Sequence, residues 1–195
     1  MPESDSQKFN HLKIHSQYSI CEGAIKIENL KVFCKENKIP CLGISDTSNL
    51  CGALEFAENI SKSGTQPIIG TQIYFRFEDT TGLLPLIALN EKGYKRIIEL
   101  SSRSYLENDA LSNPHLNIKE LLTDTDGVVL LSGTTQGLFG KLFEKGRLDE
   151  VAKIYESLSS KFDNRFYLEI QRHGDQNEIA FEKYNLKLSE KIKIP

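Results

Sequence analysis

Hydrophobic and polar positions follow two different periods along this chain. Apolar residues recur at three- and four-residue spacing in residues 27–38 and again in residues 148–162, which predicts two amphipathic helices that pack on a sheet. Short apolar runs bounded by turn residues lie between the helical stretches and predict strands. The expected strands are residues 11–15, 40–45, 67–75, 83–89, 127–132 and 165–171.

The alternation of strands and helices predicts an α/β fold built from βα units with parallel strands. No G-x-G-x-x-G motif opens the first helix, so a doubly wound dinucleotide-binding sheet is disfavoured and we expect a barrel. Residues 106–117 (LENDALSNPHLN) are polar and aperiodic, which predicts a long surface loop. The final stretch, KYNLKLSEKIKIP, predicts a helix and the first residues of a further strand, so we expect the sequence to stop short of that strand.

Length and composition favour one globular domain. A chain of 195 residues with 39% hydrophobic and 26% charged residues is ordinary for a single soluble domain. No stretch approaches the run of about 18 apolar residues that a membrane span needs. The first ten residues are polar and do not resemble a secretory signal. We therefore expect a cytoplasmic protein, with residues 1–8 as a disordered flank before a domain over residues 9–195.

Charge and cysteine content exclude two further classes of function. The net charge is -3, and basic and acidic residues are interleaved, so direct binding of DNA is not expected to be the main role of this domain. The four cysteines lie in the first third of the chain and form no CxxC pair. This pattern fits neither a disulfide framework nor a zinc ribbon, and it predicts reduced, mostly buried thiols.

Active sites of parallel barrels lie at the C-terminal ends of the strands, so the side chains there are candidates for chemistry. Two histidines and an acid at one face would suit Zn, Mn or Fe. By spacing alone, however, a hydrogen-bonded structural role is the more common one for such histidines. The side chains expected near these ends are His15, Asp46, Thr47, Gln72, Leu83, Thr134 and His173.

Six blocks of sequence closely resemble, in order and spacing, the N-terminal PHP domain of bacterial DNA polymerase III alpha subunits. The resemblance covers roughly residues 9–195, and it implies a distorted (β/α)7 barrel that is cut before its seventh strand. The blocks that carry it are HLKIHSQYSICEGA, CLGISDTSNLCGALEF, QPIIGTQIYF, LIALNEKGYKRIIELSS, GVVLLSGTTQG and RFYLEIQRHG.

The resemblance also implies where metal ligands would stand, and this sequence departs from the family at most of these positions. Members that keep the site resemble trinuclear metallo-phosphoesterases, whose clustered cations bind phosphate and generate a hydroxide nucleophile. Suitable side chains remain at His15, Glu22, Asp46 and His173, with the glutamate in place of an aspartate. The degenerate positions are Lys13, Thr47 and Leu83, each in place of a histidine, Gln72 in place of a glutamate, and Thr134 in place of a cysteine.

A pocket with these substitutions is expected to hold no metal cluster. Gln72 removes an anion and Lys13 adds a cation, a swing of about two charge units against metal occupancy. No cofactor is expected in this chain, or at most one residual divalent ion (Zn, Mn or Mg).

Two roles for the remaining side chains stay open. The ammonium group of Lys13 could replace the ion and pair with Glu22 or Asp46. Alternatively, His15 and His173 could be remnants of the site that serve only in packing. Glu169 follows an alternating apolar pattern, and we expect it to face solvent or a helix.

The resemblance implies a scaffold within a replicative polymerase. Its partners would be the rest of the alpha subunit, the replisome and the proofreading exonuclease, for which the domain would offer a docking surface, and no membrane is involved. The parent protein would be a DNA-directed DNA polymerase whose catalytic carboxylates lie in a palm domain outside this sequence. The alternatives are a metal-dependent phosphoesterase or 3′–5′ exonuclease of the PHP family, and a stand-alone histidinol-phosphatase-like enzyme. The strings TSNLCGALEF and LNEKGYKRIIELSS favour the polymerase branch over the last of these.

Overall fold

The computed structural model describes residues 9–109 and 111–195, so the predicted disordered flank over residues 1–8 lies outside the described residues. In chain order the elements are α1 (Ile27–Asn37), β1 (Cys41–Thr47), α2 (Ala53–Ser61), β2 (Gln66–Phe77), β3 (Thr80–Ala88), α3 (Glu91–Leu106), β4 (Leu116–Asn117), the 3-10 helix η1 (Ile118–Leu122), β5 (Val128–Leu131), α4 (Leu138–Glu144), α5 (Leu148–Phe162), the 3-10 turn η2 (Asp163–Arg165), β6 (Phe166–Tyr167) and α6 (Gln176–Ile192).

The strands form one six-stranded sheet in the order β1-β2-β3-β5-β6, with β4 paired to the end of β2. β1 runs parallel to β2, and β5 runs parallel to β6. β3 is antiparallel to both β2 and β5. The α/β class is therefore confirmed, whereas the expectation of parallel βα units throughout is wrong in the middle of the sheet. The sheet is open, with β1 and β6 at its two ends.

The antiparallel centre follows from the short connection between β2 and β3. Only Glu78 and Asp79 separate the two strands. Two residues can join antiparallel strands, whereas a parallel crossover needs about a dozen. Glu78 has a φ of 52°, in the left-handed region that tight hairpin turns use. The sequence predicted both strands but placed their ends too far apart to show the hairpin.

The predicted strands at the two ends of the chain are mostly irregular. Residues 11–15 run alongside β1 through an isolated parallel bridge between Ile14 and Ile44 and a hydrogen bond from the Gly43 amide to the His11 carbonyl at 2.7 Å. The approach is close because position 43 is glycine, where a Cβ would lie 2.5 Å from the Leu12 carbonyl oxygen. Of the strand expected over residues 165–171, the structure forms only β6. The predicted loop over residues 106–117 contains β4 at its end.

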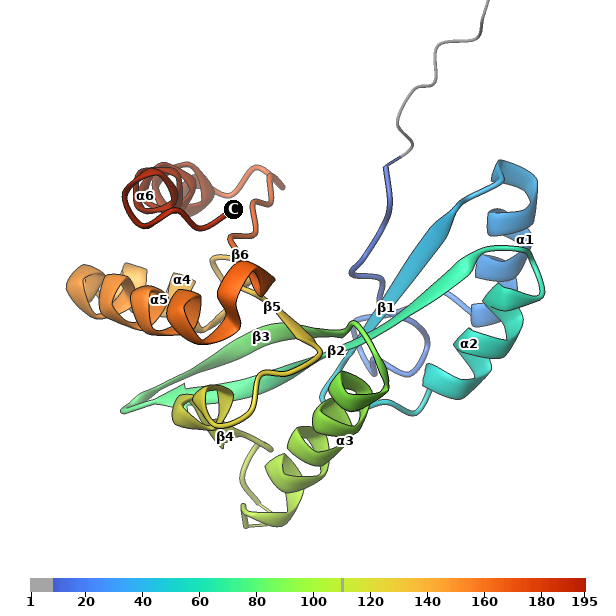
Figure 1. Ribbon diagram of the computed structural model, residues 1–195, viewed down its shortest axis with the longest axis horizontal. Helices are drawn as coiled ribbons and strands as arrows, with labels where there is room; N and C mark the ends of the chain where they lie inside the picture. Colours follow the sequence, from blue (N-terminus) through green and yellow to red (C-terminus); the bar gives the residue numbers. More distant parts are fainter. Residues whose placement is uncertain (1–8, 110) are drawn as a thin grey trace, which may run out of the picture.

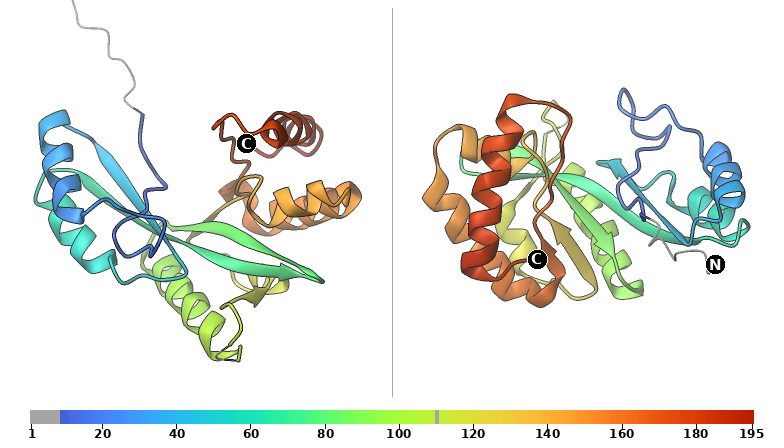
Figure 2. Two further views of the ribbon diagram at one scale, coloured as in Figure 1. Left: turned by 180° about the vertical axis from the view of Figure 1, so that it is seen from behind. Right: turned by 90° about the horizontal axis from the view of Figure 1, so that it is seen from above.

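Helices cover the sheet in separate groups. α1 and α2 lie beside β1 at one end, and α4, α5 and α6 lie together near β5 and β6 at the other (Figure 1). The view from above in Figure 2 shows the same separation. Buried side chains form two clusters accordingly, a small one around α1, α2 and β1 and a large one that includes Tyr155 and Phe166. The apolar stripes predicted for residues 27–38 and 148–162 supply much of this burial, although Phe33 stays 43% exposed.

The cysteines differ in their exposure to solvent. All four cysteines are free, and Cys34 is buried, but Cys21 and Cys51 are exposed, so the expectation of mostly buried thiols is wrong for these two.

Within residues 9–109 and 111–195, none of the helices combines the length and the apolar character that crossing a membrane requires.

An ion-pair network holds the tip of the β2–β3 hairpin against the connection between α4 and α5. Arg147 contacts Glu78, and its guanidinium lies 2.8 Å from one Asp79 oxygen, while Lys145 lies 2.9 Å from the other. The hydrogen bond from Lys145 holds the pKa of Asp79 below its ordinary value of 3.8. Arg147 likewise lowers the pKa of Glu150 from 4.5 by hydrogen bonding. Three carboxylates from two segments, the hairpin turn and α5, are thus joined by two cations.

Replacing Arg147 by methionine should reduce stability at neutral pH and reduce it less in acid. A carboxyl group whose pKa is lowered on folding stabilises the protein above its ordinary pKa and loses that contribution as the pH falls through the folded value. The pH range in which this contribution is lost therefore lies below the ordinary pKa values of Asp79 and Glu150, which are 3.8 and 4.5. Urea unfolding of the wild-type and Arg147→Met chains at neutral pH and near pH 3 measures the difference, with Lys62→Met as the control at an exposed ion pair. If Arg147→Met lost the same free energy of unfolding at both pH values, the result would contradict a stabilising role for this network.

Candidate functional site

Asp46 is the anchor of the candidate site at the end of β1. Its carboxylate is 2% exposed, and it accepts three hydrogen bonds from the loop that precedes α1. The donors are the Ser16 amide at 2.6 Å, the Ser16 hydroxyl at 2.7 Å and the Ser19 hydroxyl at 2.7 Å. A buried carboxylate needs such donors because removal of the charge from water is costly. Both oxygens of Asp46 therefore hold the loop over residues 15–22 in place.

His15 extends this contact into a polar chain. Its Nδ1 lies 3.3 Å from the Ser19 hydroxyl oxygen, and its Nε2 lies 3.1 Å from the Gln72 amide nitrogen. Because the Ser19 hydroxyl donates its proton to Asp46, it can only accept from His15, which assigns the proton of the imidazole to Nδ1. Nε2 then accepts from the Gln72 amide. The order of donation is Gln72 to His15 to Ser19 to Asp46.

Glu22 and Thr47 meet at the rim of this group. The Thr47 hydroxyl donates to a Glu22 oxygen at 2.5 Å, and the same oxygen lies 3.8 Å from His15 Nδ1. The side chain of Glu22 is 43% exposed, so this carboxylate faces water on one side. Thr47 thus binds Glu22 through its hydroxyl at a position where the resemblance to PHP domains implies an imidazole.

Lys13 pairs with a residue that the sequence did not indicate. The prediction of Glu22 or Asp46 as its partner is wrong, because its ammonium lies 2.5 Å from Glu169 Oε1, with the two side chains 18% and 12% exposed. The expectation that Glu169 faces solvent is also wrong, whereas a helix does lie opposite it, because Glu169 borders a cavity lined on its other side by α6. The strand alternation that supported it stops at Tyr167, where β6 ends, so Glu169 is free to turn inward.

Two further side chains bind Glu169, one at its backbone amide and one at its carboxylate. Its amide donates to the Ser132 hydroxyl oxygen at 2.9 Å, and Gln171 donates to its Oε1 at 2.7 Å. Ser132 is fully buried. A carboxylate on a strand that continues irregularly carries no signature in the sequence, and only the three-dimensional pairing with Lys13 reveals it.

The remaining predicted positions lie elsewhere. His173 is 74% exposed in the loop before α6, where its Nδ1 lies 3.4 Å from Glu178, and no contact within the described part of the chain joins it to His15. Leu83 pairs with Tyr74 in the β2–β3 hairpin and forms a bridge with Gly137. Thr134 accepts a hydrogen bond from the Gln136 amide at 3.3 Å.

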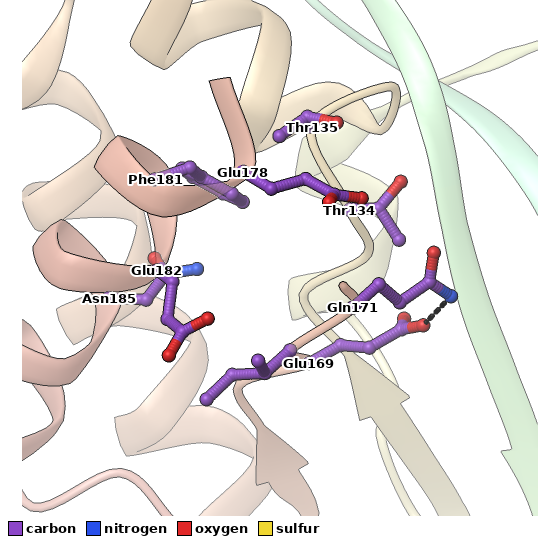
Figure 3. Close-up of a pocket in the computed structure, with 9 residues that line it drawn as sticks. Thr134, Thr135, Glu169, Gln171, Glu178, Phe181, Glu182 and Asn185 are labelled. Carbon is purple, nitrogen blue, oxygen red and sulfur yellow. Dashed lines mark hydrogen bonds between the residues drawn. The ribbon is translucent and has the colours of Figure 1, made fainter. Parts of the chain in front are cut away.

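Thr134 also borders a small cavity between the segment that follows β6 and α6. Its volume is about 10 Å³, enough for roughly one water molecule. Glu169 and Gln171 lie on one side, and Glu178, Glu182 and Asn185 of α6 lie on the other (Figure 3). The carboxylate of Glu178 already accepts from the amides of residues 173–175 and caps α6. Within residues 9–109 and 111–195, no three His, Cys, Asp or Glu side chains are arranged to hold a metal ion.

Truncating Asp46 to alanine should destabilise the chain by about 3 kcal/mol, because three bonds to a charged acceptor are lost and buried donors are left unpaired. Asp46→Asn should cost less, since the amide oxygen can still accept from Ser16. Urea unfolding measures both variants against Asp126→Ala, an exposed aspartate paired with Lys92. A D46A chain no less stable than the control would show that the carboxylate does not anchor the loop.

Comparisons with known proteins agree on the family. The family model described as the PHP domain matches residues 11–173. DNA polymerase III subunit alpha of Caulobacter vibrioides is 36% identical over 191 residues, and that of Haemophilus influenzae is 32% identical over 197 residues. These alignments cover 93% and 98% of this chain but only 17% of each relative.

A solved structure shares the fold. It belongs to a suspected metal-dependent phosphoesterase of Bifidobacterium adolescentis, with a TM-score of 0.59 and 13% sequence identity. The alignment covers 95% of this chain and 84% of that one. At this identity the likeness concerns the arrangement of helices and strands alone.

Proposed function

This chain belongs to the PHP domain family, and we propose that it is the non-catalytic PHP domain of a replicative DNA polymerase alpha subunit. The observation that carries the proposal is the set of hydrogen bonds on Asp46, because the acid retained from the ligand set is occupied by hydroxyl and amide donors. This domain would act as a scaffold in a longer polypeptide, consistent with relatives of which it spans only 16–17%.

The residues at the family's ligand positions do not fit a cluster of cations. A divalent ion binds carboxylate and imidazole lone pairs, and the lone pairs of Asp46 already accept three hydrogen bonds. Gln72 is neutral, and Lys13 brings a positive charge, which repels a second unit charge by about 4 kcal/mol at 4 Å in a protein-like dielectric. His173, exposed beside Glu178, does not complete the set. His15, Glu22 and Asp46 could together hold at most one ion, and only by releasing the loop.

Scaffolding and docking are the roles that fit a PHP domain without a metal cluster. We propose that the domain supports the polymerase core in the cytoplasm and offers a docking surface for the proofreading exonuclease of the replisome. Nucleotide transfer would belong to other domains of the alpha subunit. The net charge of -3 favours protein partners over direct contact with DNA.

A contact between residues 168 and 195 is the observation that favours a closed barrel. The Leu168 amide donates to the Pro195 carbonyl at 2.9 Å, and Ile194 is 2% exposed. These residues therefore already lie beside the continuation of β6 in a strand-like contact. We propose that a seventh strand follows this contact and that the open sheet becomes the distorted (β/α)7 barrel of the family.

Metal analysis together with phosphoesterase assays tests the proposal. The purified chain, dialysed against Zn²⁺, Mn²⁺ or Fe²⁺, should retain less than one equivalent of metal and should hydrolyse neither bis-p-nitrophenyl phosphate nor single-stranded DNA from its 3′ end. The matched variant Lys13→His/Thr47→His/Gln72→Glu restores three ligands, two imidazoles and one carboxylate, and controls for metal capture. Stoichiometric metal with turnover that a His15→Ala change abolishes would establish a phosphoesterase or exonuclease instead.

A further inference from the structure

Among the residues that the structure describes, no backbone hydrogen bond joins the two ends of the sheet. β1 and β6 stand at opposite ends of the strand order. Residues 11–14 extend the β1 end by one irregular strand, through bonds between Ile14 and Gly43 and between Gly43 and His11. On the other side, the chain leaves β6 at Tyr167 and continues through residues 168–173. Any contact between these two segments therefore crosses the open side of the sheet.

One ion pair makes this crossing. Lys13 belongs to the segment outside β1, and Glu169 belongs to the segment that follows β6, 156 positions later in the sequence. Their charged atoms lie 2.5 Å apart, and both side chains are more than four-fifths buried. The second oxygen of Glu169 is buried and makes no hydrogen bond within the described residues, so Lys13 is its principal source of neutralising charge.

The pair stands at the rim of an apolar cavity of about 560 Å³. Leu12, next to Lys13, forms one wall, while Tyr167 and Leu168, next to Glu169, form the opposite wall. The inward side chains of the sheet lie between them, and they are Ile68, Ile87, Val129 and Leu131. The contact between Lys13 and Glu169 therefore fixes the distance between the two walls of the cavity.

We propose that the Lys13–Glu169 ion pair is a clasp that ties the two ends of the open sheet together and keeps the apolar walls on either side in register. A pair at this depth is screened by salt much less than a surface pair. Removing one partner leaves an uncompensated buried charge, which costs more than removing both. The clasp does not depend on the proposed function, because it concerns how the sheet is held and not what the domain binds.

A double-mutant cycle on the intact chain tests the clasp. Lys13→Met and Glu169→Gln should each lower the melting temperature by about 5 °C, and the double variant should be more stable than the sum of the two losses predicts. Lys13→Arg, which keeps the charge, should lose little. The control cycle uses Lys62 and Glu58, an exposed pair at 3.8 Å, which should show no coupling.

Hydrogen exchange separates a clasp from a general loss of stability. In Lys13→Met, the amides of Ile14 and Leu168 should exchange faster, while amides in the β2–β3 hairpin should change no more than in a destabilised control such as Asp46→Asn. If Lys13→Met does not fold, Lys13→Met/Glu169→Leu decides, since the clasp predicts that removing both charges restores a folded chain. Additive losses, or exchange that rises evenly over the whole chain, would overturn the proposal.

Discussion

The organisation of the site depends on how one buried carboxylate is satisfied. Asp46 lies at the end of β1 with 2% of its surface exposed, so its lone pairs must be matched by cations or by hydrogen-bond donors. The chain matches them with Ser16 and Ser19. This choice sets the direction of every bond beyond it, because Ser19 must then accept from His15 and His15 must accept from Gln72. Glutamine at position 72 suits this order, since its amide supplies the donor that a carboxylate lacks.

The same reasoning applies to the positive charge at Lys13. An ammonium group can take over part of the electrostatic task of a metal ion, provided that an acid lies within reach. Glu169 is that acid, and Ser132 and Gln171 fix its position. An ammonium group on a flexible stem forms one close contact where an ion would gather several ligands. It can therefore bridge two segments, but it cannot organise a phosphate and a hydroxide as a metal cluster does.

The sequence predicted those parts of the fold that repeat along the chain and missed those that depend on a single turn or contact. The stripes in α1 and α5 and the apolar runs of β1, β2, β3 and β5 were visible because periodicity reports burial directly. The β2–β3 hairpin was missed because the strands extend through polar residues to the Glu78–Asp79 turn. At the site, the positions of His15, Asp46 and Gln72 followed from the family motifs. The partner of Lys13 did not, because irregular backbone after β6 breaks the alternation that placed Glu169 outward.

A network of hydrogen bonds and one ion pair gives this domain a different dependence on its surroundings from that of a metal site. Binding of a metal only to the folded state ties stability to the concentration of that metal and to the pH at which its ligands lose their protons. The hydrogen bonds of Asp46 and the Lys13–Glu169 pair are made by side chains of the protein itself, so their contribution does not depend on the supply of a metal. Under the proposed scaffold role this independence is an advantage, because partners can dock on a surface whose shape does not change with the supply of metal.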